Sequence, residues 1–117
     1  MNRFKELLVW QKAIDLAVEV YKITEKLPEE ERYGLISQIN RSVISIPSNI
    51  AEGAGRNTAK EFNNFLGIAQ GSSFELDIQL IISNRLDFIT TEDYQKFEKR
   101  LEHIQNMIAK LKMSLNV

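Results

Sequence analysis

Apolar residues recur every three or four positions through nearly the whole chain, and this rhythm most constrains the fold. It is clearest near the C-terminus, in the series Tyr94, Phe97, Leu101, Ile104, Ile108, Leu111 and Leu115. Such spacing places the apolar side chains on one side of an α-helix. Across the chain it predicts four helices, over about residues 5–26, 34–54, 58–86 and 91–114.

Local signals refine three of these helices. Thr58 and Glu61 form a Thr-x-x-Glu capping box, which is typical of a helix start. Pro47 lies inside the second helix, where we expect a kink because the apolar register continues on both sides of it. Gly53-Ala54-Gly55 follows, and we expect these residues to end that helix in a left-handed conformation.

The connections near residues 27–33, 54–57 and 88–91 are short, and short links between long helices favour antiparallel neighbours. The predicted fold is therefore all-α, an up-down-up-down antiparallel four-helix bundle. A chain of 117 residues has the usual length of one domain, so we expect a single domain over residues 1–117.

Composition excludes several classes of protein. With 44% hydrophobic residues and 15 Lys plus Arg against 16 Asp plus Glu, the chain is not disordered. It has no cysteine, which excludes disulfide scaffolds and thiolate metal sites. Its apolar runs, such as Leu7–Trp10 and Leu80–Ile82, are far shorter than the ~20 residues of a membrane span. Residues 1–10 do not resemble a signal peptide, so we expect a soluble, cytoplasmic protein without a membrane partner.

The sequence lacks the residue patterns of common catalytic and cofactor sites. His103 is the only histidine, and Arg100 stands three residues before it, so the Glu-x-x-His pairs of di-metal bundles are missing. No serine stands in an elbow-type turn, and no glycine-rich phosphate loop occurs. We therefore predict that the protein is not an enzyme and has no catalytic residues, metal, cofactor or small-molecule substrate.

The second predicted helix carries unusual residues on its polar face. Serine and asparagine are poorer helix formers than lysine and glutamate, so their presence indicates close packing or a polar contact. These alternatives define a candidate binding or interface face that consists of Arg41, Ser45, Ser48, Asn49, Glu52 and Arg56.

The first three predicted helices have apolar arcs that are wider than one small bundle requires. The third also carries two mid-helix glycines, each costing about 1 kcal/mol relative to alanine, which provide a smooth surface for another backbone. Surplus apolar stripes of this kind favour a subunit interface over ordinary core. The candidate oligomer interface comprises Trp10, Ile14, Tyr21, Gly67, Gly71, Phe74 and Ile78.

Basic residues exceed acidic ones by three between residues 96 and 112. The excess is compatible with a solvated helix face, but in a ring of identical chains it would be repeated, and phosphate contacts would add. No aromatic residue interleaves with it to stack a base. The candidate nucleic-acid contacts are Arg41, Arg56, Lys60, Lys96, Lys99 and Arg100.

Motifs along the chain resemble those of a known family. The segment Ile46–Gly53, followed by Gly55-Arg56, resembles the signature of the 23S ribosomal RNA intervening-sequence proteins, also called four-helix bundle proteins. Val9–Ala13 is similar to the family's opening motif, and Tyr33–Leu35 to its second-helix entry. The resemblance extends over about residues 4–113.

This resemblance implies a bacterial four-helix bundle that assembles as a homopentameric ring. It also implies a likeness in fold to the accessory variability protein of diversity-generating retroelements, which binds nucleic acid. That branch is strongly basic, whereas this chain has a net charge of −1 and carries Asn40 where many relatives are basic. We therefore predict a non-catalytic oligomeric interaction scaffold linked to a ribonucleoprotein, with an RNA- or DNA-binding module as the alternative.

Overall fold

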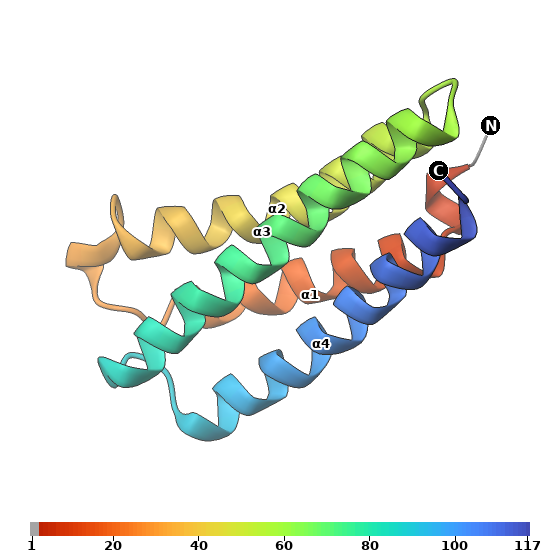
Figure 1. The fold of residues 1–117 in the computed structure, drawn as a ribbon. Coiled ribbons are helices and arrows are strands. Elements are labelled where there is room, and N and C mark those ends of the chain that lie inside the picture. The colour runs from red at the N-terminus through yellow and green to blue at the C-terminus, as the bar shows by residue number, and fades with distance from the viewer. Residues whose placement is uncertain (1–2) are drawn as a thin grey trace.

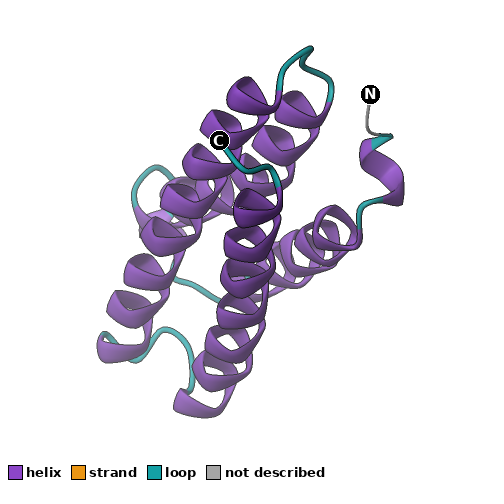
Figure 2. Cartoon of the chain, turned by 45° about the vertical axis from the view of Figure 1, so that its right-hand side comes forward, coloured by secondary structure: helices purple, strands orange, loops and turns teal. Residues whose placement is uncertain are grey.

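The structure, a computed structural model, describes residues 3–117, which form four α-helices and no strand. The helices are joined by short loops (Figures 1 and 2). Their bounds are α1 Leu8–Thr24, α2 Leu35–Ala54, α3 Ala59–Arg85 and α4 Thr91–Ser114, with short 3-10 helices η1 Phe4–Glu6 and η2 Glu29–Glu31. The prediction of an all-helical fold with four helices is confirmed.

Consecutive helices run in opposite directions along a bundle that measures 43 × 24 × 20 Å (Figure 1). Each helix contacts the next one along the chain, and α1 contacts α4, which closes the bundle. The contact between α2 and α3 is the most extensive of these, and that between α1 and α4 is the least. Within residues 3–117, no helix combines the length and apolarity needed to cross a bilayer.

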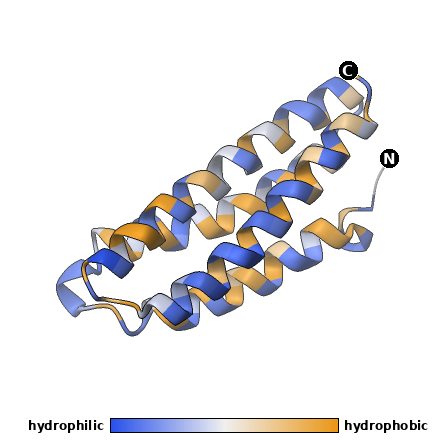
Figure 3. Cartoon of the chain, turned by 60° about the horizontal axis from the view of Figure 1, so that its bottom comes forward, coloured by the Kyte–Doolittle hydropathy of each residue, from blue (hydrophilic) through white to orange (hydrophobic). Residues whose placement is uncertain are grey.

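The core lies along the bundle axis, where the apolar stripes of the helices meet. Hydrophobic and hydrophilic residues alternate along the helices in Figure 3, as expected when one side of a helix is buried and another is exposed. The largest completely buried side chains are Leu16, Val20, Ile39, Val43, Ile46, Ile50, Leu66, Leu76, Leu80, Leu101, Ile104 and Ile108. Burial of a leucine or isoleucine contributes about 1.5–3 kcal/mol, so these stripes supply most of the apolar stabilisation of the bundle.

The first and third helices begin close to their predicted positions. Leu7 is extended, with φ −73° and ψ 123°, so α1 starts at Leu8, three residues after the predicted boundary. At α3, the Thr58 hydroxyl accepts a hydrogen bond from the Glu61 backbone N–H at 3.1 Å, as the capping box predicts. The same hydroxyl donates to the Glu61 carboxylate at 3.0 Å.

Pro47 does not interrupt α2, which continues through it as one helix with the Pro47 side chain buried. Figure 1 shows α2 changing direction near its middle, as expected where proline removes one backbone hydrogen bond and crowds the preceding turn.

The predicted left-handed stop at Gly53-Ala54-Gly55 is wrong. Gly55 is right-handed, with φ −83° and ψ −4°, and no glycine among residues 3–117 has a positive φ. Gly53 is instead a point of close approach between α2 and α3. A Cβ atom on Gly53 would lie 2.6 Å from Phe65 Cβ and 2.9 Å from Phe62 Cδ1. The missing side chain, rather than backbone freedom, accounts for glycine at this position.

Candidate functional site

The predicted polar face of α2 is divided between different environments. Ser45 and Asn49 face α3: the Ser45 and Ser72 hydroxyl oxygens lie 2.8 Å apart, and Ser72 is buried. The Asn49 side-chain amide donates to the Ser45 carbonyl oxygen at 2.8 Å and to its hydroxyl at 2.9 Å. The Ser45–Ser72 hydrogen bond joins α2 to α3, and the Asn49 bonds within α2 satisfy its amide, because buried hydroxyl and amide groups are stable only when hydrogen-bonded.

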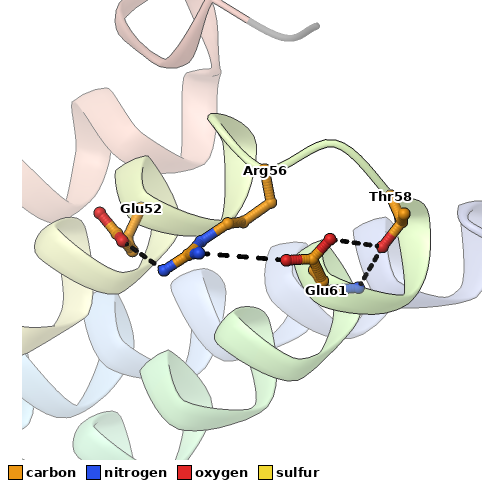
Figure 4. Close-up of polar contacts among 4 residues, drawn as sticks. All are labelled: Glu52, Arg56, Thr58 and Glu61. Atoms are coloured by element: carbon orange, nitrogen blue, oxygen red, sulfur yellow. Dashed lines mark hydrogen bonds and ion pairs between the residues drawn. The ribbon is translucent and has the colours of Figure 1, made fainter.

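Glu52 and Arg56 form a second environment, at the turn between α2 and α3 (Figure 4). Arg56 Nη2 lies 2.7 Å from Glu52 Oε1, and Nη1 lies 4.0 Å from Glu61 Oε2. The Arg56 guanidinium also stands 4.8 Å from the centroid of the Phe65 ring. Its charge is thus balanced by two carboxylates, which weakens the case for Arg56 as a phosphate contact.

Arg41 and Ser48 form the third environment. Both are exposed on α2, and neither side chain makes a hydrogen bond or ion pair within residues 3–117. Five of the six residues of the predicted face therefore lie on α2 and Arg56 lies just beyond it, but the structure does not bring the six together as one site.

The predicted nucleic-acid contacts also lie on different surfaces of the bundle. Lys96, Lys99 and Arg100 lie together on α4, where they line hollows against α1. Lys60 lies in the first turn of α3, at the opposite end of the bundle from the start of α4 (Figure 1). The predicted contacts on α2 and α3 therefore belong to a different surface from those on α4.

Helix α1 contributes basic residues to the hollows that the sequence analysis did not select. They are Lys12 and Lys22, and Lys26, which lies just after the end of α1, lines the same hollows. Their spacing, on one helix face together with Asp15 and Glu19, was visible in the sequence. That this face borders α4 rather than open solvent depends on the packing of the bundle.

An apolar stripe runs along the outer side of α3, opposite its buried side. This α3 stripe consists of Gly67, Gly71, Phe74, Ile78 and Ile82. Phe74, Ile78 and Ile82 are 51%, 56% and 44% exposed, whereas Leu76 and Leu80 on the same helix are completely buried. Ile82 was missed by the sequence analysis, although it continues the four-residue step from Phe74 and Ile78.

A second apolar surface lies between α1 and α2. This α1–α2 groove, of about 430 Å³, is walled mainly by Ile14, Ala17, Val18, Tyr21 and Ile44. Ile14 and Tyr21 were predicted interface residues, and Val18 and Ile44 were not. The third predicted α1 residue, Trp10, is half-buried against the core, and its ring meets that of Phe4 edge-on at 5.2 Å.

The side chains that could support catalysis do not gather. His103 is exposed on α4, and the hydroxyls of Ser45, Ser72, Ser73 and Ser83 bond to one another, to Asn49 or to backbone carbonyls. Across the described part of the chain, no three histidine, cysteine, aspartate or glutamate side chains come together as metal ligands.

Tyr94 is the residue with the most perturbed titration. Its hydroxyl stands 2.8 Å from Asp77 Oδ1 on α3 and 3.0 Å from Glu98 Oε2 on α4, so two carboxylates share one donated proton. Burial, followed by the hydrogen bonds to Asp77 and then Glu98, raises the pKa of Tyr94 well above its ordinary value.

This raised pKa predicts a loss of stability in alkali. The folded state holds the Tyr94 proton more tightly than the unfolded state, so its contribution is complete below about pH 10 and declines as the pH rises further. We expect Tyr94→Phe to cost about 1 kcal/mol at pH 8, because both hydrogen bonds are lost. Urea unfolding of both proteins should show this difference shrinking above pH 10. A difference that stays constant to pH 11.5 would contradict the assignment.

The chain is similar to one defined group of proteins. The family model described as 23S rRNA-intervening sequence protein matches residues 5–110. The fold resembles the crystal structure of a protein of unknown function from the S23 ribosomal protein family of Bacteroides thetaiotaomicron VPI-5482. The two chains are 26% identical, the match covers 90% of this chain and 98% of that one, and the TM-score is 0.84. No curated protein matches the chain. The family match confirms the resemblance drawn from the motifs: the chain belongs to the 23S rRNA-intervening sequence protein family.

Proposed function

We propose that this protein is a non-catalytic subunit of a homo-oligomeric ring, a pentamer as the resemblance implies, that serves as an interaction scaffold for a ribonucleoprotein. The observation that carries the assembly is the α3 stripe. A helix that buries one apolar side in its own bundle and exposes another needs a second partner, because exposed apolar patches of this kind mark protein contacts.

The α1–α2 groove provides a surface of matching character. It is mainly apolar, and the α3 stripe is likewise an exposed apolar surface. The two surfaces lie on different helices, so contact between them is head-to-tail rather than two-fold symmetric. Head-to-tail contacts generate a closed ring when the rotation between neighbours closes.

The first test is the mass of the particle in solution. Light scattering of the wild-type chain should give about five times the 13.5 kDa mass of one chain. Ile78→Asp places a charge in the middle of the α3 stripe and should release monomers. Asn106→Asp, an equal charge change at an exposed position of α4, should leave the mass unchanged. A wild-type protein that stays monomeric at micromolar concentration would rule out the proposal.

The family's link with ribosomal RNA supports a second candidate, a nucleic-acid-binding module. The observation that favours it is the clustering of Lys96, Lys99 and Arg100 beside α1, in hollows where Asp93 is the α4 acid that lies with them. In a ring this cluster would be repeated once per subunit, and the phosphate contacts would add. The test is to measure the affinity for RNA at increasing salt concentration. We expect binding at low salt and an affinity that falls as the salt concentration rises.

A further inference from the structure

Two hollows adjoin along the seam between α1 and α4. One, of about 270 Å³, lies toward the end of α1 and the start of α4, and the other, of about 250 Å³, lies farther along the same seam. Arg100 lines both, so the two hollows are neighbours along the seam, and together they are here called the α1–α4 groove. The groove exists because α1 and α4 make the least extensive contact of the neighbouring helices.

The groove is positively charged although the chain as a whole is not. Three acidic residues line it, namely Asp15, Glu19 and Asp93. Six basic residues line it, namely Lys12, Lys22, Lys26, Lys96, Lys99 and Arg100. The local surplus is therefore three positive charges, against a net charge of −1 for the whole chain.

The basic residues on the two helices are not used to hold the helices together. Lys22 pairs with Glu19 at 3.5 Å within α1, and Lys96 pairs with Glu92 at 3.5 Å within α4. Within residues 3–117, no ion pair crosses from α1 to α4. Positive charges thus face one another across a concave surface, an arrangement that raises the local concentration of anions.

The floor of the groove offers charge attraction but little apolar contact. Ile23 and Phe97 are each only 7% exposed, and Ile104 is 1% exposed. An apolar partner helix would therefore find almost no surface to cover, and no aromatic face is available to stack a base. A ligand that binds here must do so mainly through repeated negative charges.

We propose that the α1–α4 groove binds a single strand of nucleic acid through its phosphate groups, without reading its sequence. This inference rests on the second proposed function and assigns it to one surface. The two hollows, of about 270 Å³ and 250 Å³, are small, so they suit one phosphodiester chain better than a duplex. Lys26 lies at one end of the groove and Lys12 and Lys99 at the other, which distributes the contacts along the strand.

The experiment measures binding of fluorescent 20-nucleotide oligouridine by anisotropy, from 30 mM to 300 mM salt. Lys26→Gln combined with Lys99→Gln removes two exposed groove cations that form no ion pair in the described chain. Each phosphate contact to single-stranded nucleic acid contributes about 0.7 to the salt slope, so the slope should fall by about 1.4. Affinity at 0.1 M salt should fall about 25-fold.

The matched control is Lys5→Gln combined with Arg85→Gln, which makes the same charge change on exposed residues that lie outside the groove and are not among the predicted nucleic-acid contacts. Its salt slope should equal that of the wild type. If the wild type binds and both variants bind equally well, the groove is wrong but nucleic-acid binding stands. If the wild type does not bind RNA at 30 mM salt, both are wrong.

Two further measurements identify the ligand class. Duplex RNA should bind more weakly than the single strand, and a preference for duplex would overturn the single-strand assignment. Polyglutamate of equal charge should compete poorly, because carboxylates along a peptide do not reproduce the spacing of phosphates along a strand. Equal competition by polyglutamate would mean that the groove accepts acidic protein segments rather than nucleic acid specifically.

Discussion

Leu76→Ala should lower the free energy of unfolding by about 3–5 kcal/mol, the largest effect expected for a single substitution in this bundle. Leu76 is completely buried in the middle of α3. Truncation removes its favourable transfer from water and leaves a cavity, since four packed helices cannot close over the vacated space. Urea unfolding monitored by circular dichroism measures the loss directly.

Ile78→Ala is the matched control for this prediction. Ile78 lies two residues farther along α3 but is 56% exposed on the α3 stripe. Its truncation should change the stability of the folded chain by no more than about 0.5 kcal/mol. If the stripe is a subunit contact, the variant should also lose the part of its stability that depends on protein concentration. If Leu76→Ala and Ile78→Ala lowered the free energy of unfolding equally at low protein concentration, the assignment of Leu76 to the buried side of α3 and of Ile78 to its exposed side would be contradicted.

Gly53→Ala should destabilise the protein by about 2–3 kcal/mol, although alanine is the better helix former. The added Cβ would lie 2.6 Å from Phe65 Cβ, far inside the usual contact distance of about 3.5–4.0 Å. Because Phe65 Cβ is attached directly to the α3 backbone, it cannot be relieved by a rotamer change. The helices must move apart where their contact is most extensive.

Gly71→Ala, the same glycine-to-alanine change at another position, should stabilise the protein rather than destabilise it. No heavy atom lies within 4 Å of the Cβ that alanine would add, and Gly71 lies in the interior of α3. Improved helix propensity should therefore raise the free energy of unfolding by about 1 kcal/mol. Thermal unfolding of Gly53→Ala and Gly71→Ala, each compared with the wild type, measures both changes in stability. A destabilising Gly71→Ala together with a neutral Gly53→Ala would show that the α2–α3 contact is misjudged.

Except for Lys22, which lines both grooves, the three surfaces described above consist of different residues. The α3 stripe and the α1–α2 groove are apolar, and we assign them to contacts between copies of the chain. The α1–α4 groove is basic, and we assign it to phosphate. This separation allows assembly and nucleic-acid binding to be tested independently, because Ile78→Asp leaves the groove residues unchanged and the groove variant leaves the α3 stripe unchanged.

Much of the fold was predictable because it depends on local and periodic signals. The four apolar stripes indicated the helices, since a 3.6-residue period places their members on one side. The N-terminal cap of α3 followed from Thr58 and Glu61, which are three residues apart and interact within one turn. Pro47 was correctly kept inside α2, because the apolar register continued beyond it.

The candidate site was less predictable, since it depends on which helices become neighbours. Ser45 was recognisable as an unusual helix residue, but its partner Ser72 lies 27 residues away in the sequence. The role of Gly53 was predicted wrongly, because the sequence alone does not distinguish a glycine that allows close helix packing from one that allows a left-handed turn. The distance to Phe65 distinguishes these two cases, and that distance exists only once α2 and α3 have packed.

The sequence by itself determined the number of helices, most of their core residues and the family, because each of these depends on patterns within a helix or a motif. It also showed that surplus apolar residues were present on α3. Only the tertiary structure decided which charges share a surface. Lys26, just after α1, and Lys99, on α4, are 73 positions apart, yet both line the α1–α4 groove. A chain with a net charge of −1 can therefore carry a strongly basic groove, since packing, and not composition, sets the local field.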